Sequence, residues 1–253
     1  MKRTIAVLFA ALFVSGVALA SDGSLEKVRG QKEVVVGFCA QYPPFESKNL
    51  KTGDFEGFDV DLARALAKEM GVSVRFVDAE WQGLLGGLAK GDFDMLLTCM
   101  SRSEARSANA NFSDIYYRLA DVIVVNKKNA DIKGLADLTG KVVGVQVGSG
   151  SEQFADSMKG HFKAIKRYNY NPEAFSDLKF GRIDAVLVGA TFAIRQSKVD
   201  PSYKVVGAPL AEAEIVAVMK KGADALTEEV NAALGRLNKS GEYRAIHDRW
   251  LAM

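Results

Sequence analysis

Short apolar strands alternate with helices through the first hundred residues, and this order restricts the fold more than any other feature of the sequence. Each strand is a nearly continuous apolar run, which is typical of a parallel strand covered on both faces. The expected strands are residues 33–38, 72–77 and 93–97, and the helices between them are residues 58–70 and 81–90. Because parallel strands need crossover connections of fixed hand, this order predicts an α/β fold built on a parallel sheet.

The same alternation continues in the second half of the chain. The expected strands there are residues 121–125, 141–145, 183–188 and 214–219, and the expected helices are residues 171–182, 227–239 and 241–251. A glycine-bearing loop at 146–155 opens a further helix, with Ser149 and Ser151 as candidate N-caps and Glu152 as a capping partner. Since a helix N-terminus attracts anions, such a loop could bind a phosphate, but the lysine pattern of a phosphate-binding loop is absent.

The first twenty residues have the pattern of an export signal. Two basic residues precede an apolar run at 5–14, which is too short to span a bilayer, and an A-x-A pattern follows at 18–20. We therefore expect residues 1–20 to be a signal peptide and the mature protein to be periplasmic. Residues 21–32 are polar, and we expect them to form a frayed lead-in.

Charge and cysteine content argue against several classes of function. The chain has 33 Lys+Arg and 31 Asp+Glu, and without Lys2 and Arg3 both totals are 31. A net charge near zero argues against nucleic acid or an anionic membrane as the partner.

Cys39 and Cys99 follow strands that are expected to be neighbours, so they could form a disulfide or remain a pair of small buried thiols. The cysteines and histidines form no zinc pattern, and we expect no metal and no cofactor.

Small polar residues and an arginine follow the third expected strand. Thr98, Cys99 and Ser101 come directly after it, and a short helix is expected to open near Ser103 and to carry Arg106. Ligands of open α/β sheets bind outside the carboxyl ends of the strands. Free N–H groups in a turn and the planar donor fork of arginine suit a carboxylate, although a lone helix arginine is more often solvated.

Taken together, these segments resemble the bacterial extracellular solute-binding proteins of family 3, the periplasmic binding proteins of polar amino-acid ABC importers. The matching segments are YPPF at 42–45, GFDVDLA at 57–63, WQGLLGGLAKGDFD at 81–94, FSDIYY at 112–117, LKFGRIDAV at 178–186 and GEYRAIHDRW at 241–250. The resemblance covers nearly all of the mature chain. It implies a two-lobed type II periplasmic binding protein fold, in which each lobe is a mostly parallel sheet flanked by helices and a two-strand hinge joins the lobes.

The resemblance also implies how the chain is divided and what it does. Lobe 1 would consist of residues 21–120 and, after the chain returns, residues 214–253, while residues 121–213 would form lobe 2. A protein of this kind is a monomer that captures a small carboxylate-bearing ligand, an amino acid or a related organic acid, by hinge closure. It delivers this ligand to a membrane ABC permease and is not an enzyme.

By the same resemblance, Arg106 would pair with the ligand carboxylate, helped by Ser101 and Ser149. Tyr42 and Trp81 would cover the apolar part of the ligand; a structural role at the start of a helix is the alternative for Trp81. Arg102 is expected to be solvated. The expected ligand-binding residues are Arg106, Ser101, Cys99, Ser149, Tyr42, Trp81, Gly189 and Thr191.

One position departs from the family pattern. After the strand at 183–188 the family has an aspartate that pairs with the ligand ammonium, whereas this chain has Gly189. No acid lies between Ala185 and Asp200. Because a buried ammonium without a carboxylate partner costs several kcal/mol, either Thr191 or another acid takes this role, or the ligand has no α-ammonium.

An enzyme is the alternative function. Cyclohexadienyl (arogenate/prephenate) dehydratases use the same fold and have a similar sequence pattern. Such an enzyme needs a carboxylic acid in the cleft to protonate a leaving hydroxyl. Glu152 and Glu80 are the candidate acids, but neither has an evident partner that would raise its pKa.

Overall fold

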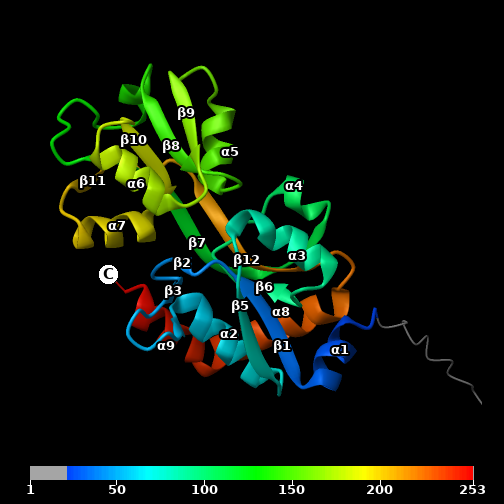
Figure 1. Ribbon diagram of the computed structural model, residues 1–253. Coiled ribbons are helices and arrows are strands. Elements are labelled where there is room, and N and C mark those ends of the chain that lie inside the picture. Colours follow the sequence, from blue (N-terminus) through cyan, green and yellow to red (C-terminus); the bar gives the residue numbers. More distant parts are fainter. Residues whose placement is uncertain (1–21, 253) are drawn as a thin grey trace, which may run out of the picture.

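Two lobes joined by two long antiparallel strands make up the computed structural model, which describes residues 22–252 except for the side chains of 104 and 105 (Figure 1). The connecting strands are β7 (Ala110–Asn126, green) and β12 (Glu212–Lys220, orange). The two-lobed α/β fold with a two-strand hinge is therefore confirmed. The expected signal peptide lies outside the described residues.

The first lobe contains the N-terminal and C-terminal parts of the described chain. Its strands are β1 (Glu33–Phe38), β2 (Gln41–Tyr42), β3 (Glu46–Lys48), β4 (Phe55–Glu56), β5 (Ser73–Asp78) and β6 (Met95–Leu96). Its helices are α1 (Ser24–Gln31), α2 (Phe58–Glu69), the 3-10 turn η1 (Trp81–Gly83), α3 (Leu84–Lys90), α4 (Glu104–Ser107), α8 (Asp224–Ser240) and α9 (Glu242–Trp250).

The second lobe is formed by the segment between the two connecting strands. Its strands are β8 (Val142–Gln146), β9 (Ala164–Tyr168), β10 (Ala185–Gly189) and β11 (Tyr203–Val206). Its helices are η2 (Leu135–Leu138), α5 (Gly150–Ser157), α6 (Asn171–Lys179) and α7 (Ala190–Val199).

One hydrogen-bonded sheet runs through both lobes in the order β5-β1-β6-β12-β7-β10-β8-β9, with β11 also paired to β7. In the first lobe β1 is parallel to β5 and β6, and in the second lobe β8 is parallel to β9 and β10. The connecting strands are antiparallel to each other over most of their length. The expected lobe boundaries at 120/121 and 213/214 each fall inside a continuous strand, and they stay a prediction.

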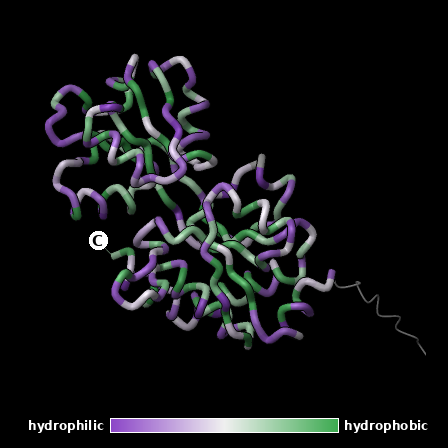
Figure 2. The backbone as a smooth tube through the Cα atoms, viewed as in Figure 1, coloured by the Kyte–Doolittle hydropathy of each residue, from purple (hydrophilic) through white to green (hydrophobic). Residues whose placement is uncertain are grey.

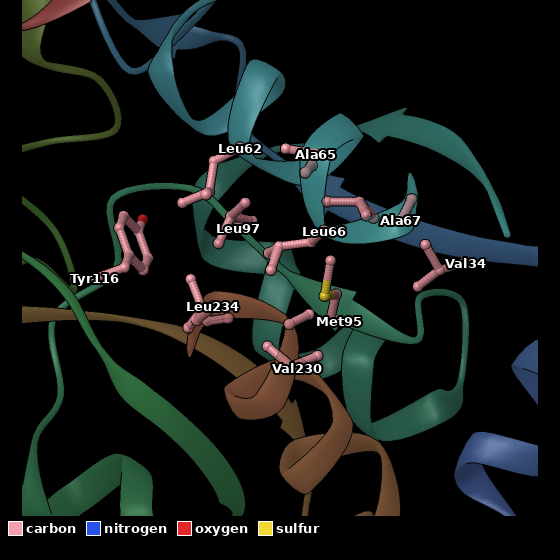
Figure 3. Packing of buried hydrophobic residues seen from close by; sticks show 14 of the residues in the cluster. Val34, Leu62, Ala65, Leu66, Ala67, Met95, Leu97, Tyr116, Val230 and Leu234 are labelled. Atoms are coloured by element: carbon pink, nitrogen blue, oxygen red, sulfur yellow. The ribbon is translucent and has the colours of Figure 1, made fainter. Parts of the chain in front are cut away.

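Apolar side chains from α2 and α8 pack on the sheet of the first lobe. Leu62 and Leu66 of α2, Met95 of β6 and Val230 of α8 belong to one buried cluster (Figure 3). The second lobe has its own core, in which Phe175 and Phe192 are almost fully buried. Apolar residues follow the strands inside both lobes, while polar residues cover the outside (Figure 2).

The prediction of a frayed lead-in at 21–32 is wrong, because helix α1 occupies most of that segment. Val28 anchors this helix in the core, where it is fully buried. Lys27 pairs with Asp94 at 2.8 Å, and the other oxygen of this buried carboxylate accepts from Val35 N. A single buried apolar residue produces no periodic pattern, so this helix has no local signal in the sequence.

Within residues 22–252, no helix combines the length and the apolar character needed to cross a membrane.

Replacing Leu66 tests the packing between α2 and the sheet. Leu66 is fully buried, so Leu66→Ala should lower the free energy of unfolding by about 2–5 kcal/mol through lost burial and a cavity. Chemical denaturation measures this loss. Leu50 is 98% exposed, and Leu50→Ala should change stability by no more than about 0.5 kcal/mol. Equal midpoints for the two variants would contradict this packing.

Candidate functional site

A cavity between the two lobes collects most of the residues singled out in the sequence. Of the expected ligand-binding residues, those that line it are Tyr42, Trp81, Cys99, Ser101, Ser149 and Gly189. Arg106 and Thr191 lie outside its lining. Thr98, which follows the third expected strand, also lines it. Sequence reasoning missed several other polar residues of the lining: Gln41, Glu46, Asp121, Gln146, Tyr170 and Asn171.

The N-terminus of α5 forms the wall contributed by the second lobe. Ser149 caps the helix, because its Oγ accepts from Glu152 N at 3.1 Å and donates to Gln146 O at 2.7 Å. The next two residues, Gly150 and Ser151, leave their backbone N–H groups without an acceptor among the described residues. These N–H groups and the helix dipole make the wall suited to an anion.

Glu152 completes the cap and faces away from the cavity. One of its oxygens accepts from Gly148 N at 2.6 Å, and the other pairs with Arg167 at 2.5 Å. Neither Glu152 nor Glu80 lines the cavity.

Arg106 lies next to Ser101, which lines the cavity, but is not itself part of the lining. Its Nη1 donates to Ser101 O at 2.6 Å and to Ser101 Oγ at 2.9 Å, and its Nη2 donates to Gly148 O. The side chain is buried, which lowers the pKa of the guanidinium without discharging it. Among the side chains that the structure describes, no carboxylate pairs with it.

Further contacts hold the lobes against each other around the cavity. Trp81 Nε1 donates to Val147 O at 2.9 Å, and the Tyr42 ring stacks on Phe192 at 4.8 Å between centroids. With the bond from Arg106 to Gly148, these contacts come from three separate segments of the first lobe. Tyr42 and Trp81 thus both line the cavity and bridge the lobes.

Gly189 ends β10 at the edge of the cavity. A β-carbon at this position would overlap the Tyr42 hydroxyl and would lie 2.6 Å from Leu119 Cδ2. The absence of a side chain therefore makes room for Tyr42. Thr191 follows in α7, where its hydroxyl is buried and lies 3.4 Å from the Tyr117 hydroxyl.

Asp121 stands directly opposite Gly189 in the antiparallel pairing of β7 with β10. Its carboxylate is buried and hydrogen-bonded to Ser151, and burial raises the pKa of this group to about 6. No lysine, arginine or histidine within residues 22–252 pairs with it. The sequence reasoning treated this residue only as the first position of a strand.

A second pair of acids supports the wall formed by the first lobe. Glu46 and Asp59 face each other and are both almost completely buried. Asp59 accepts from Cys99 N at 2.5 Å and from the Tyr116 hydroxyl at 3.1 Å, while Glu46 accepts from Thr98 Oγ1 at 2.9 Å. Burial and the neighbouring acid raise the pKa of Glu46, and burial raises that of Asp59 to about 7. We infer that a proton on Glu46 joins the two carboxyl groups.

Both cysteines line the cavity as free thiols. Burial raises the pKa of Cys39 to about 12 and raises that of Cys99 as well, so both groups are protonated at neutral pH. Cys99 has a left-handed backbone with φ of 45°, which is held by the bond from its N–H to Asp59. Of the two alternatives left open above, the structure shows thiols. No cluster of potential metal ligands occurs among the described residues.

Arg102 is about half exposed and lies 3.6 Å from Glu214 at the rim. This position agrees with the expected solvated role.

The buried acid pair predicts a loss of stability as the pH rises from the acidic range. An acid whose pKa is raised by folding contributes stability that is fully present below its unfolded-state pKa and is lost as the pH rises through the folded-state pKa. The melting temperature should therefore fall from about pH 4, where the unfolded acids lose their protons, through about pH 7, where folded Asp59 loses its own. Glu46→Gln keeps a donor towards Asp59 and an acceptor for Thr98, so this variant should show a smaller fall between pH 5 and 7. Parallel curves for the two proteins would refute the shared proton.

Comparison with known proteins places this geometry in a family. Residues 34–253 match the Bacterial extracellular solute-binding proteins, family 3. The arginine-binding extracellular protein ArtP of Bacillus subtilis is 31% identical to this chain, covering 99% of it and 98% of ArtP. The L-cystine-binding protein TcyJ of Escherichia coli K12 is 29% identical over 98% of this chain and 95% of TcyJ.

Solved structures show the same similarity. An ancestral arginine-binding protein bound to arginine is 37% identical with a TM-score of 0.82, covering 87% of this chain and 98% of that one. The ancestral amino acid-binding protein AncCDT-1, described as a precursor of cyclohexadienyl dehydratase, is 35% identical with a TM-score of 0.83, covering 90% and 99%. The chain belongs to the bacterial extracellular solute-binding proteins of family 3.

Proposed function

We propose that this protein captures an amino acid between its lobes and delivers it to a membrane ABC permease. It acts as a periplasmic monomer exported by the signal peptide at 1–20, and it is not an enzyme. The observation that carries this proposal is the buried guanidinium of Arg106 next to the N-terminus of α5, which no carboxylate among the described side chains pairs with. The relatives whose names state a ligand bind amino acids, which supports the same class.

The ligand carboxylate is assigned to the corner between Arg106, Ser101 and the start of α5. Ser101 Oγ already lies 2.9 Å from Nη1, and Arg106 has five N–H donors, not all of which are used by Ser101 and Gly148. Gly150 and Ser151, whose N–H groups have no acceptor among the described residues, line the same cavity. A carboxylate here gives the buried cation its counter-ion, so its binding is favoured by both charge and hydrogen bonds.

The remaining walls suit the rest of an amino acid. Trp81 and Tyr170 provide aromatic surface, while Gln146 and Asn171 provide amide groups for polar atoms of the ligand side chain. Since Tyr42, Trp81 and Arg106 hold the lobes together at the cavity, capture requires opening and closing about β7 and β12. Hinge closure of this kind is established for periplasmic binding proteins.

A dehydratase is the second candidate, and one observation favours it. Asp121 is a cavity acid with a pKa of about 6, as general acid catalysis requires, and AncCDT-1 is described as the precursor of such an enzyme. Incubation with prephenate separates the two functions. Product formation above a buffer control would establish the enzyme, and its absence is expected.

Removal of Arg106 tests the assigned carboxylate site. Arg106→Ala should weaken the binding of amino acids by about 30-fold or more, because it removes the partner of a buried charge. Thermal-shift screening of the twenty amino acids and cystine identifies the ligand, and calorimetry measures its affinity.

Arg102→Ala is the matched control, since Arg102 is half exposed and only four positions away. This variant should change the affinity by less than about threefold, as expected for a rim charge. An Arg106→Ala protein that keeps the wild-type affinity and melting temperature would exclude this carboxylate site. Failure of every amino acid to stabilise the wild-type protein would exclude the proposed function.

A further inference from the structure

We propose that Asp121 is the counter-ion for the ammonium group of the ligand, and that it replaces the aspartate missing at position 189. The proposal rests on the function proposed above. In the pairing of β7 with β10, Asp121 is the direct partner of Gly189, and both residues line the cavity. A carboxylate at position 121 therefore reaches the same end of the cavity from the neighbouring strand.

The surroundings of the Asp121 carboxylate are suited to binding a cation. It is 7% exposed, and its only described side-chain partner is the neutral hydroxyl of Ser151. A buried carboxylate without a positive partner is costly, so proteins usually pair it or bind a cation with it. Since no basic side chain of residues 22–252 pairs with Asp121, a cationic group of the ligand is the partner that fits.

Asp121 and the carboxylate site meet at the start of α5. A β-carbon built on Gly150 would lie 3.4 Å from Ser101 Oγ and 4.0 Å from Asp121 Oδ2. Ser101 Oγ is in turn 2.9 Å from Arg106 Nη1. The guanidinium of Arg106 and the carboxylate of Asp121, neither of which has an ionic partner among the described side chains, thus lie on either side of one small corner of the cavity. This arrangement matches an α-amino acid, whose carboxylate and ammonium are attached to the same carbon.

The packing around Gly189 explains why the acid is not at that position. The Tyr42 hydroxyl occupies the space of a side chain there, and the Tyr42 ring is stacked on Phe192 across the lobes. An aspartate at 189 would displace this contact. Thr191, the other alternative raised by the sequence, points to Tyr117 and does not line the cavity.

The pairing makes binding depend on pH. Three groups face Asp121 from the surrounding elements: the hydroxyl of Ser151, the thiol of Cys99 and the phenol of Tyr42. Burial raises the pKa values of the thiol and the phenol, so neither titrates in the acidic range. As the pH falls through about 6, Asp121 takes up a proton and loses its attraction for an ammonium. Affinity for amino acids should therefore fall below pH 6, by up to about tenfold per unit.

Asp121→Asn tests the assignment by calorimetry with L-arginine and L-glutamine, each compared with its deaminated analogue, δ-guanidinovalerate or glutaramate. The variant should bind the amino acids about 30-fold or more weakly, and the analogues with little change. Its affinity should also become independent of pH between 5 and 7.5. Without ligand, it should melt at a higher temperature than the wild type at pH 7.5, because an uncompensated buried charge has been removed.

Other outcomes are equally decisive. If Asp121→Asn binds amino acids with an affinity within threefold of the wild type, the assignment is overturned. Thr191→Val is the control, and its affinity should stay within threefold of the wild type. If Asp121→Asn does not fold, Asp121→Ser replaces it with the same expected loss. Should the wild type bind the analogues but not the amino acids, Asp121 is not an ammonium partner although the carboxylate site stands. If the wild type binds neither class and no other amino acid of the thermal-shift panel, the proposed function itself is excluded.

Discussion

The pairing of β7 with β12 is the interaction on which the rest of the structure depends. These strands are antiparallel from Glu212 opposite Ala120 to Lys220 opposite Ala110, so the chain leaves the first lobe and returns to it along one ribbon. The ribbon also contributes Leu119, Asp121 and Ile215 to the cavity. Because the hinge and the base of the cavity are the same strands, a ligand at the base contacts the element about which the lobes move.

Two buried charges of opposite sign give this cavity its chemical character. Arg106 and Asp121 are both almost excluded from water, and neither has an ionic partner among the described side chains. Each carries a desolvation cost in the folded protein that a counter-ion can offset. A zwitterion supplies both counter-ions at once, whereas a simple carboxylate leaves Asp121 unpaired. Under the proposed binding mode, the stability that the protein forgoes at these two positions becomes selectivity for α-amino acids.

Local patterns in the sequence predicted many of the strands and helices, while the two-lobed arrangement was implied by the resemblance to family 3. The strand at Glu33–Phe38 and the cap of α5 by Ser149 follow from apolar runs and from capping chemistry, both of which act over a few residues. The helix at Ser24–Gln31 was missed because its stability comes from the single buried Val28 and from contacts with distant residues. Likewise, the sequence shows that Gly189 stands where the family has an aspartate, but it does not show which residue takes the role of that aspartate. Asp121 is identified only by the register of β7 against β10, a pairing of residues 68 positions apart.

The wall on the side of the first lobe is held by a network that no local pattern reveals. Asp59 binds the N–H of Cys99 and so fixes the left-handed turn after β6, while Glu46 binds Thr98, whose Oγ1 in turn accepts from Cys39 N. Because burial and the neighbouring acid raise the pKa of Glu46, a proton on this residue lets the two acids lie together and support the wall. The wall thus depends on contacts between segments far apart in the sequence, which is why it could not be predicted from local patterns.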